Sequence, residues 1–213
     1  MKATVFSKKE DTARGPDGFS VTFYKRCWDT IKMERLEMVN DFYMCRLDLT
    51  RLNYWVKTLV PKVKEATNVK QFRPICLLNV SSKIFSKLIM DRLTLLADRI
   101  ISKSHFAFVK GRYILDGAVM LHEVMLEMRH KKLKGVVLKR DFEKAYDSIN
   151  WEFVEEVLHK KKFDPKIINW IMQTVKGGGC RIYFRTYRGL KQGDPLSPLL
   201  FNLAADALSG ILC

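Results

Sequence analysis

The stretch that decides the fold is Gly135–Asp147, which reads GVVLKRDFEKAYD. Its run of apolar and β-branched residues predicts a short, largely buried strand over Val136–Phe142. Asp141 then falls at the end of that strand, where a carboxylate can leave the core and reach a cleft. A carboxylate held by a rigid strand suits a hard cation such as Mg²⁺. The alternative interpretation of this stretch by itself is a solvated charged turn.

Two helical patterns follow this stretch. Asn150 is a good N-cap residue, and apolar residues at helical spacing after it predict a helix over 150–162. A Ser-Pro start predicts a second helix over 198–208. We therefore expect an α+β fold in which the strand Val136–Phe142 lies in a small antiparallel sheet packed on both helices.

Other elements are predicted upstream and between these. Tyr54–Val60 and Phe72–Leu78 are rich in aromatic and β-branched residues and are expected to form paired strands. Arg181–Tyr187 alternates basic and apolar residues as an exposed strand does. Ile114–Met128 is predicted to be an amphipathic helix whose methionines pack in the core. Further helices, each with a capping residue or an apolar stripe, are predicted after Ser20 as far as Ile31, over 36–43, after Ser81 or Ser82, and after Asp164.

The charge is the strongest global feature of the sequence. The 213 residues include 38 Lys and Arg against 23 Asp and Glu, which leaves a formal net charge of +15. Such an excess favours a polyanionic partner, because phosphate contacts supply most non-specific affinity for nucleic acid. The alternatives are charge for solubility or an anionic membrane surface, although no basic amphipathic helix of the membrane type is present.

Several classes of protein are disfavoured by the sequence. No apolar run approaches the roughly 18 residues that a membrane-spanning helix needs, and the N-terminus has no apolar signal-peptide core. We therefore expect an intracellular protein of the nucleus or cytoplasm with no membrane partner. The five cysteines are scattered and lack metal-ligand spacing, so reduced thiols are expected.

Five ordered blocks of the sequence resemble a known family. Residues 141–147 (DFEKAYD) and 188–198 (RGLKQGDPLSP) are similar to two blocks of the reverse transcriptases, particularly those of non-LTR (LINE-type) retrotransposons of the plant type. Residues 15–19 (GPDGF), 72–79 (FRPICLLN) and 108–112 (FVKGR) resemble the upstream blocks in the same order. The resemblance covers nearly the whole chain, and the order of the blocks makes it specific.

This resemblance implies a right-hand polymerase with fingers and a partial palm. The expected division is an N-terminal helical extension at 1–50, fingers at 51–133 and palm at 134–213. The implied reaction is RNA-directed DNA synthesis at a two-metal Mg²⁺ site, on an RNA template with a DNA primer and deoxynucleoside triphosphates. Asp141 would be the catalytic residue and bind both metal ions, and the main-chain carbonyl of Phe142 would bind one of them.

The resemblance also implies a nucleotide-binding set. Tyr146 matches the aromatic residue that lies under the sugar and favours deoxynucleotides, and Gln192 matches the residue that packs on the incoming nucleotide. Gly193 would let its loop approach the template. Lys62 and Arg73, on the two predicted finger strands, would contact the triphosphate. The alternative for these two cations is an ordinary solvated hairpin.

Departures from the family pattern bear on activity. The family carries its remaining metal ligands on an aromatic-Ala-Asp-Asp hairpin, whereas no Asp-Asp dipeptide occurs in this chain. We therefore expect a partial copy, inactive as given, that ends before that hairpin and lacks a thumb. Alternatives are a catalytically dead nucleic-acid-binding remnant and a group II intron maturase-like protein. The sequence leaves the oligomeric state open.

Overall fold

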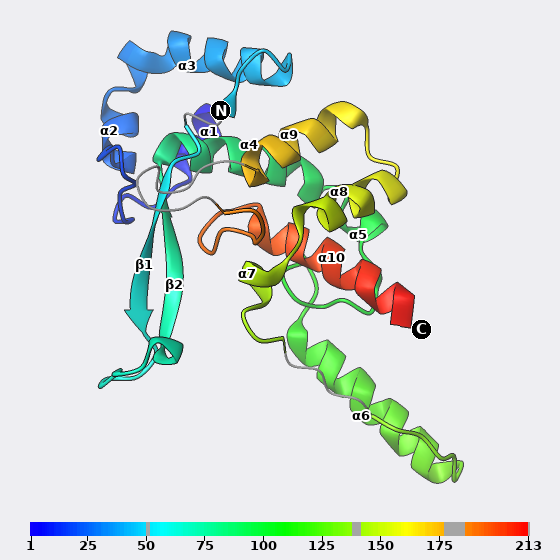
Figure 1. The fold of residues 1–213 in the computed structure, drawn as a ribbon. Helices are drawn as coiled ribbons and strands as arrows, with labels where there is room; N and C mark the ends of the chain where they lie inside the picture. Colours follow the sequence, from blue (N-terminus) through cyan, green and yellow to red (C-terminus); the bar gives the residue numbers. More distant parts are fainter. Residues whose placement is uncertain (50–51, 138–141, 177–185, 213) are drawn as a thin grey trace.

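The computed structural model describes residues 1–49, 52–137, 142–176 and 186–212, which form a helical body and one small hairpin at its side (Figure 1). Its elements in chain order are α1 (Lys2–Phe6), α2 (Val21–Arg26), α3 (Trp28–Tyr43), β1 (Trp55–Pro61), η2 (Val69–Gln71), β2 (Phe72–Leu78), α4 (Val80–Thr94), α5 (Ala97–Ile100), α6 (Ile114–His130), α7 (Ala145–Ser148), α8 (Trp151–Lys160), α9 (Pro165–Val175) and α10 (Ser197–Leu212). The mixture of helices and a small antiparallel sheet is an α+β fold.

Strands β1 and β2 form an antiparallel hairpin that projects from the helical body (Figure 1). Trp55 pairs with Leu78 at its base, where both side chains are buried, and Pro61 pairs with Phe72 at its far end. Pro74 lacks an N–H to donate, and a two-stranded sheet tolerates it because each strand has a free edge. Both predicted strands and their pairing are confirmed.

The largest apolar core lies among four helices. Helix α8 packs against α9 and α10, and α9 also packs against α4. Leu158 of α8, Ile171 of α9 and Leu200 of α10 are almost fully buried in this core. The predicted helices at 150–162 and 198–208 are therefore present as α8 and α10, and each buries its apolar stripe.

The predicted capping residues act at three helix starts. The side-chain oxygens of Ser20, Asn150 and Asp164 accept hydrogen bonds from the first turns of α2, α8 and α9. The helix that begins after Ser20 is interrupted at Cys27, however, rather than running past Ile31. Helix α4 begins at Val80, one or two residues before the predicted serine caps.

Asn79 at the start of α4 connects two of the sequence blocks. Its side-chain oxygen accepts a hydrogen bond from the Asp17 N–H at 3.1 Å, and its amide donates to the Leu52 carbonyl at 3.3 Å. A Cβ at Gly15 would lie 2.5 Å from the Asn79 backbone. The backbone at position 15 therefore lies so close to the Asn79 backbone that only glycine fits there, which explains Gly15 in the GPDGF block.

The predicted strand Val136–Phe142 is wrong over the residues that the structure describes. Val136 and Val137 are 93% and 59% exposed and form no strand, and Phe142 is 51% exposed. Residues 138–141, including Asp141, lie outside the described residues. A strand must pair its backbone groups with a neighbour, and within the described ranges the only ladder joins β1 to β2. Helices α8 and α10 accordingly pack on one another and not on Val136 or Val137. Most of the other predicted strand, Arg181–Tyr187, also lies outside the described residues.

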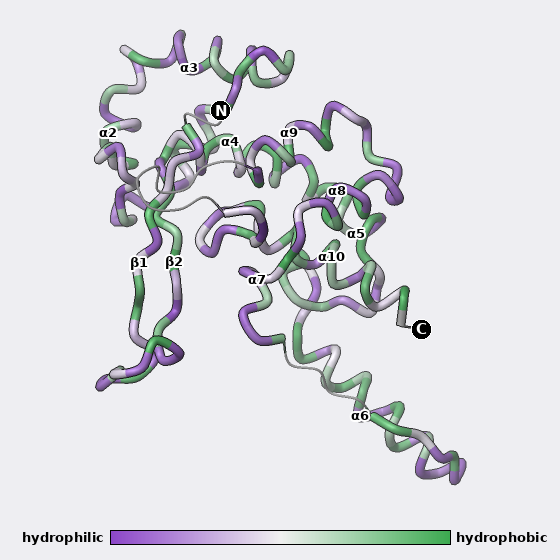
Figure 2. The backbone as a smooth tube through the Cα atoms, viewed as in Figure 1, coloured by the Kyte–Doolittle hydropathy of each residue, from purple (hydrophilic) through white to green (hydrophobic). Residues whose placement is uncertain are grey.

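Helix α6 is correctly predicted as a helix but wrongly predicted as a core element. It extends away from the body (Figure 1), and hydrophobic residues recur along its length (Figure 2). None of its residues is buried, and Met120 and Met125 are 45% and 49% exposed. Its methionines therefore do not fill the core as predicted. No helix in the described part of the chain is long and apolar enough to cross a membrane.

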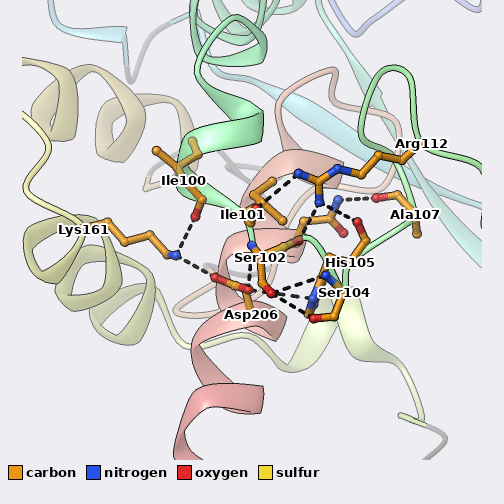
Figure 3. Close-up of polar contacts among 10 residues, drawn as sticks. Ile100, Ile101, Ser102, Ser104, His105, Ala107, Arg112, Lys161 and Asp206 are labelled. Atoms are coloured by element: carbon orange, nitrogen blue, oxygen red, sulfur yellow. Dashed lines mark hydrogen bonds and ion pairs between the residues drawn. The ribbon is translucent and has the colours of Figure 1, made fainter. Parts of the chain in front are cut away.

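Asp206 of α10 connects three parts of the fold (Figure 3). Its carboxylate accepts hydrogen bonds from the Lys161 Nζ at 2.6 Å and the Ser102 N–H at 3.1 Å, and His105 Nδ1 lies 3.8 Å away. Arg112 folds the same loop together by donating to the carbonyl oxygens of Ser102 and His105. This network holds the segment after α5, with the FVKGR block, against α10.

The Asp206 network makes stability dependent on pH. Burial by itself raises the pKa of Asp206, but the hydrogen bonds from Lys161 and Ser102 and the charges of Lys161 and His105 lower it below the ordinary value of 3.8. Because the folded-state pKa lies below the unfolded one, this stabilisation is present above about pH 4 and is lost as the pH falls through the folded value. We expect Asp206→Asn to lower the free energy of unfolding by roughly 1–3 kcal/mol at neutral pH, measured by urea denaturation.

The matched control is Asp29→Asn, because the Asp29 side chain is 91% exposed and its partner Lys32 is also accessible. This control should change stability by less than about 0.5 kcal/mol. The loss of unfolding free energy caused by Asp206→Asn should be smaller at acid pH than at neutral pH. An equal deficit at neutral and acid pH would contradict the electrostatic explanation.

Candidate functional site

A cleft lies between the β1–β2 hairpin and the segment around α7. Its volume is about 1120 Å³. One wall comes from both strands and the turn between them, and the other from residues 142–152 and 186–192. Five of the seven site residues predicted from sequence line it, namely Lys62, Arg73, Phe142, Tyr146 and Gln192. Gly193 lies beside the lining residue Gln192, and Asp141 is outside the described residues.

The cleft is electropositive. Its lining cations are Lys57, Lys62, Lys70, Arg73, Lys144 and Arg188, against the acids Glu143, Asp147 and Glu152. Lys57 of β1 forms a 2.9 Å ion pair with Asp147 across the cleft, so one acid is already neutralised. The remaining cations outnumber the remaining acids. A concave surface of this charge attracts phosphate groups and other anions.

The loop before α10 is bonded to the outer edge of β2. The Cys76 N–H donates to the Gln192 carbonyl at 2.8 Å. Gly193 follows with a φ of +110°, and a Cβ there would lie 3.1 Å from the Cys76 carbonyl oxygen. Glycine is therefore required both for the backbone conformation and for the close approach. This contact places Gln192 at the wall of the cleft.

The same loop is bonded to the opposite side of the site. The Leu190 N–H donates to the Tyr146 carbonyl at 2.6 Å, and the Gly189 N–H donates to the Ile149 carbonyl at 2.7 Å. The Trp151 indole N–H donates to the Gly189 carbonyl at 2.7 Å. The loop thus connects β2 with the start of α8, and the two blocks of the sequence are brought together by backbone hydrogen bonds.

Tyr146 is held by stacking. Its ring lies almost parallel to that of Phe201 in α10, with the centroids 5.1 Å apart and an interplanar angle of 13°. Burial raises the pKa of the Tyr146 hydroxyl, which therefore stays protonated at neutral pH. A neutral aromatic ring fixed at the wall of a cleft offers a flat apolar surface to a ligand.

The described residues do not by themselves form a metal centre. Among them, no group of three or more His, Cys, Asp or Glu is arranged to hold a metal ion. In the cleft, Asp147 is paired with Lys57. Elsewhere, Asp206 accepts hydrogen bonds from Lys161 and Ser102. A two-metal site therefore does not fit the described residues alone.

Comparison with known proteins identifies the fold. A family model described as reverse transcriptase (RNA-dependent DNA polymerase) matches residues 60–212. The chain belongs to the reverse transcriptase family. Enzymes of this family use divalent metal ions and bind a nucleic-acid template and nucleotides.

The relatives of this reverse transcriptase domain are retrotransposon proteins. The chain is 28% identical to the Pol polyprotein of the R2 element of Nasonia vitripennis over 92% of its own length and 19% of the relative. It is 26% identical to the 149 kDa protein of transposon TX1 of Xenopus laevis, over 90% of its own length and 15% of that relative. It is 28% identical to the R2DM polyprotein of Drosophila melanogaster, over 70% of its own length and 15% of that relative. The chain spans less than a fifth of each relative. The assignment to non-LTR retrotransposons is confirmed, whereas the plant type stays a prediction.

Sequence reasoning missed Lys57, which lines the cleft, and Phe201, which stacks on Tyr146 from α10. Lys57 and Phe201 lie in elements that were predicted, but no local pattern marks them as neighbours of Asp147 and Tyr146. Alternation along the predicted strand Tyr54–Val60 puts Lys57 and Leu59 on one face, and both line the cleft. That alternation is the one signal that indicated Lys57. The stacking of Phe201 could not be found without the tertiary structure.

The requirement for glycine at position 193 can be tested with a matched pair of variants. Gly193→Ala and Gly18→Ala both place a Cβ at positive φ, but Gly18 has open space around its Cβ position and Gly193 has the Cys76 carbonyl. In both variants, backbone strain should lower the free energy of unfolding by roughly 1 kcal/mol or more. We expect Gly193→Ala to lower the free energy of unfolding more than Gly18→Ala does, measured by urea denaturation. Gly193→Ala should also shift the amide resonances of β2, measured by NMR. Equal losses without a shift in β2 would contradict the close packing of this loop.

Proposed function

We propose that this chain is the part of a retrotransposon reverse transcriptase that binds the primer–template and the incoming deoxynucleoside triphosphate. The observation that carries the proposal is the cleft itself. Residues from four separate parts of the sequence meet in it, at Lys62, Arg73, Tyr146 and Gln192. In the proposed division, fingers at 51–133 supply the hairpin wall and palm residues at 134–213 supply the opposite wall.

The residues have separate proposed roles. Lys62 and Arg73 neutralise the triphosphate, because both line the cleft on the hairpin side. Gln192 packs on the nucleotide from the loop that is bonded to β2. Tyr146, supported by Phe201, lies under the sugar and disfavours a 2′-hydroxyl. Asp141 and the Phe142 carbonyl are the proposed ligands of Mg²⁺.

A second candidate function is nucleic-acid binding without catalysis. The observation that favours it is the electropositive cleft, whose lining cations outnumber its lining acids. Binding through cations survives the loss of metal ligands, whereas phosphoryl transfer depends on positioning and charge neutralisation by the metal ions. The two candidates therefore differ in chemistry and not in partner.

Binding of RNA and RNA–DNA hybrids is expected to depend steeply on salt. Each phosphate that the protein neutralises releases counterions, so log affinity should fall with log salt by about 0.7–0.9 per contact. Lys62→Ala should reduce the magnitude of that slope by about the amount expected for one contact. Lys160→Ala, at an exposed position on α8, should leave the slope unchanged. The measurement is fluorescence anisotropy across a salt series. An affinity that does not change with salt would rule out this electrostatic mode.

Primer extension separates the two candidate functions. We expect the 213-residue chain to incorporate no deoxynucleotide on an RNA template in Mg²⁺, because Asp141 supplies one carboxylate to a site that must hold two divalent ions. Extension is measured with labelled primer, and Asp141→Asn is the control. Robust extension that Asp141→Asn abolishes would show that this chain is catalytically competent.

A further inference from the structure

Lys191 precedes Gln192 in the loop, but its side chain points away from the cleft. Only 8% of the residue is exposed, and it is absent from the residues that line the cleft. Its Nζ donates to the Thr174 carbonyl at 2.7 Å and to the side-chain oxygen of Asn53. A cation in a loop next to a polyanion site would ordinarily face that site, so the inward direction of this one needs a reason.

The partners of Lys191 are themselves fixed. The Asn53 amide donates to the Thr174 carbonyl at 2.9 Å, and the Ser82 hydroxyl donates to the Asn53 oxygen at 3.2 Å. Thr174 lies in the last turn of α9, where carbonyl groups have no partner within the helix and the helix dipole favours a positive charge. The ammonium therefore binds at a point that joins α9, α4 and the segment before β1.

Burying this ammonium is unfavourable. Burial lowers the pKa of Lys191 to about 8, and the charge of the neighbouring Asp194 opposes that shift only in part. A neutral residue would avoid the desolvation of a charged group. A neutral apolar residue would not supply the hydrogen bonds that tie the loop to α9, which are strong because the donor is charged.

We propose that Lys191 is a positioning residue, whose bonds to Thr174 and Asn53 anchor the loop 188–195 to α9 so that Gln192 and Gly193 are held against β2. Adjacent residues in this loop face opposite ways, with Lys191 bonded inward and Gln192 at the cleft. The role of Gln192 in nucleotide binding rests on the proposed function, but the anchoring of the loop does not.

The geometry explains why one anchor controls the site. The Cys76–Gln192 bond and the bond from the Leu190 N–H to the Tyr146 carbonyl connect the loop to each wall of the cleft. The lysine lies between these two bonds in the sequence. Without it, the loop keeps its backbone bonds, the Trp151 bond to Gly189 and the buried Asp194. It loses the side-chain anchor next to Gln192, so Gln192 loses its fixed position.

The test compares Lys191→Met with Lys166→Met in the 213-residue chain. Methionine has a similar volume but no donor or charge, and Lys166 is an exposed lysine at the opposite end of α9. Hydrogen exchange is measured for the Cys76 amide, with Ile171 and Leu200 as reporters of global opening. The affinity for dGTP with Mg²⁺ is measured by calorimetry on the same samples.

We expect Lys191→Met to speed exchange of the Cys76 amide by about tenfold or more, the order expected for one hydrogen bond to a charged group. Ile171 and Leu200 should keep their wild-type rates, and affinity for dGTP should fall while Lys166→Met changes neither quantity. Lys191→Arg, which keeps the charge and the donors, should restore part of the protection at Cys76.

Two outcomes would overturn the positioning role, an unchanged Cys76 rate and an equal rise at all three amides. Faster exchange at Cys76 in a chain whose wild type does not bind dGTP would support the anchor and reject the proposed nucleotide site. If Lys191→Met does not fold, Asn53→Leu removes the side-chain acceptor and leaves the bond to Thr174. It should produce a smaller rise at the Cys76 amide, and no rise there would also overturn the proposal.

Discussion

The cleft depends on one backbone hydrogen bond, from the Cys76 N–H to the Gln192 carbonyl. The N–H groups of a strand alternate between its two edges, so each strand of a two-stranded hairpin, β2 included, has a free edge of unpaired donors and acceptors. In this chain the loop before α10 takes up part of that free edge. The pairing brings two distant blocks of the sequence together and turns the hairpin into one wall of a cleft.

The conformation of the loop follows from this contact. Gly193 must accept a positive φ and lie within van der Waals distance of the Cys76 carbonyl, and Gly189 approaches the backbone of Asp147 in the same way. Side chains at either position would push the loop away from its neighbour. Lys191 holds the loop from the interior, whereas Gln192 lies at the cleft. The two glycines let the loop lie close to its neighbours, and the Lys191 ammonium anchors the same loop from inside.

The electrostatics of the cleft are consistent with the composition of the whole chain. A net charge of +15 indicates a polyanionic partner but does not say where it binds. In the structure, cations from the hairpin, the α7 region and the loop converge on one concave surface, and Asp147 is neutralised by Lys57. The family assignment and this distribution of charge are both consistent with the proposed binding of nucleic acid and nucleotides.

The sequence by itself determined the local elements and the family. Strands 54–60 and 72–78, the caps at Asn150 and Asp164, and five of the residues that line the cleft were predictable, because propensity, capping and motif order depend on nearby residues. The strand Val136–Phe142 and the buried methionines of α6 were wrong over the described residues, because an apolar run does not specify a partner. The inward direction of Lys191 and the stacking of Tyr146 on Phe201 were decided by the tertiary structure alone. Both depend on contacts between residues far apart in the chain, and such contacts leave no local pattern in the sequence.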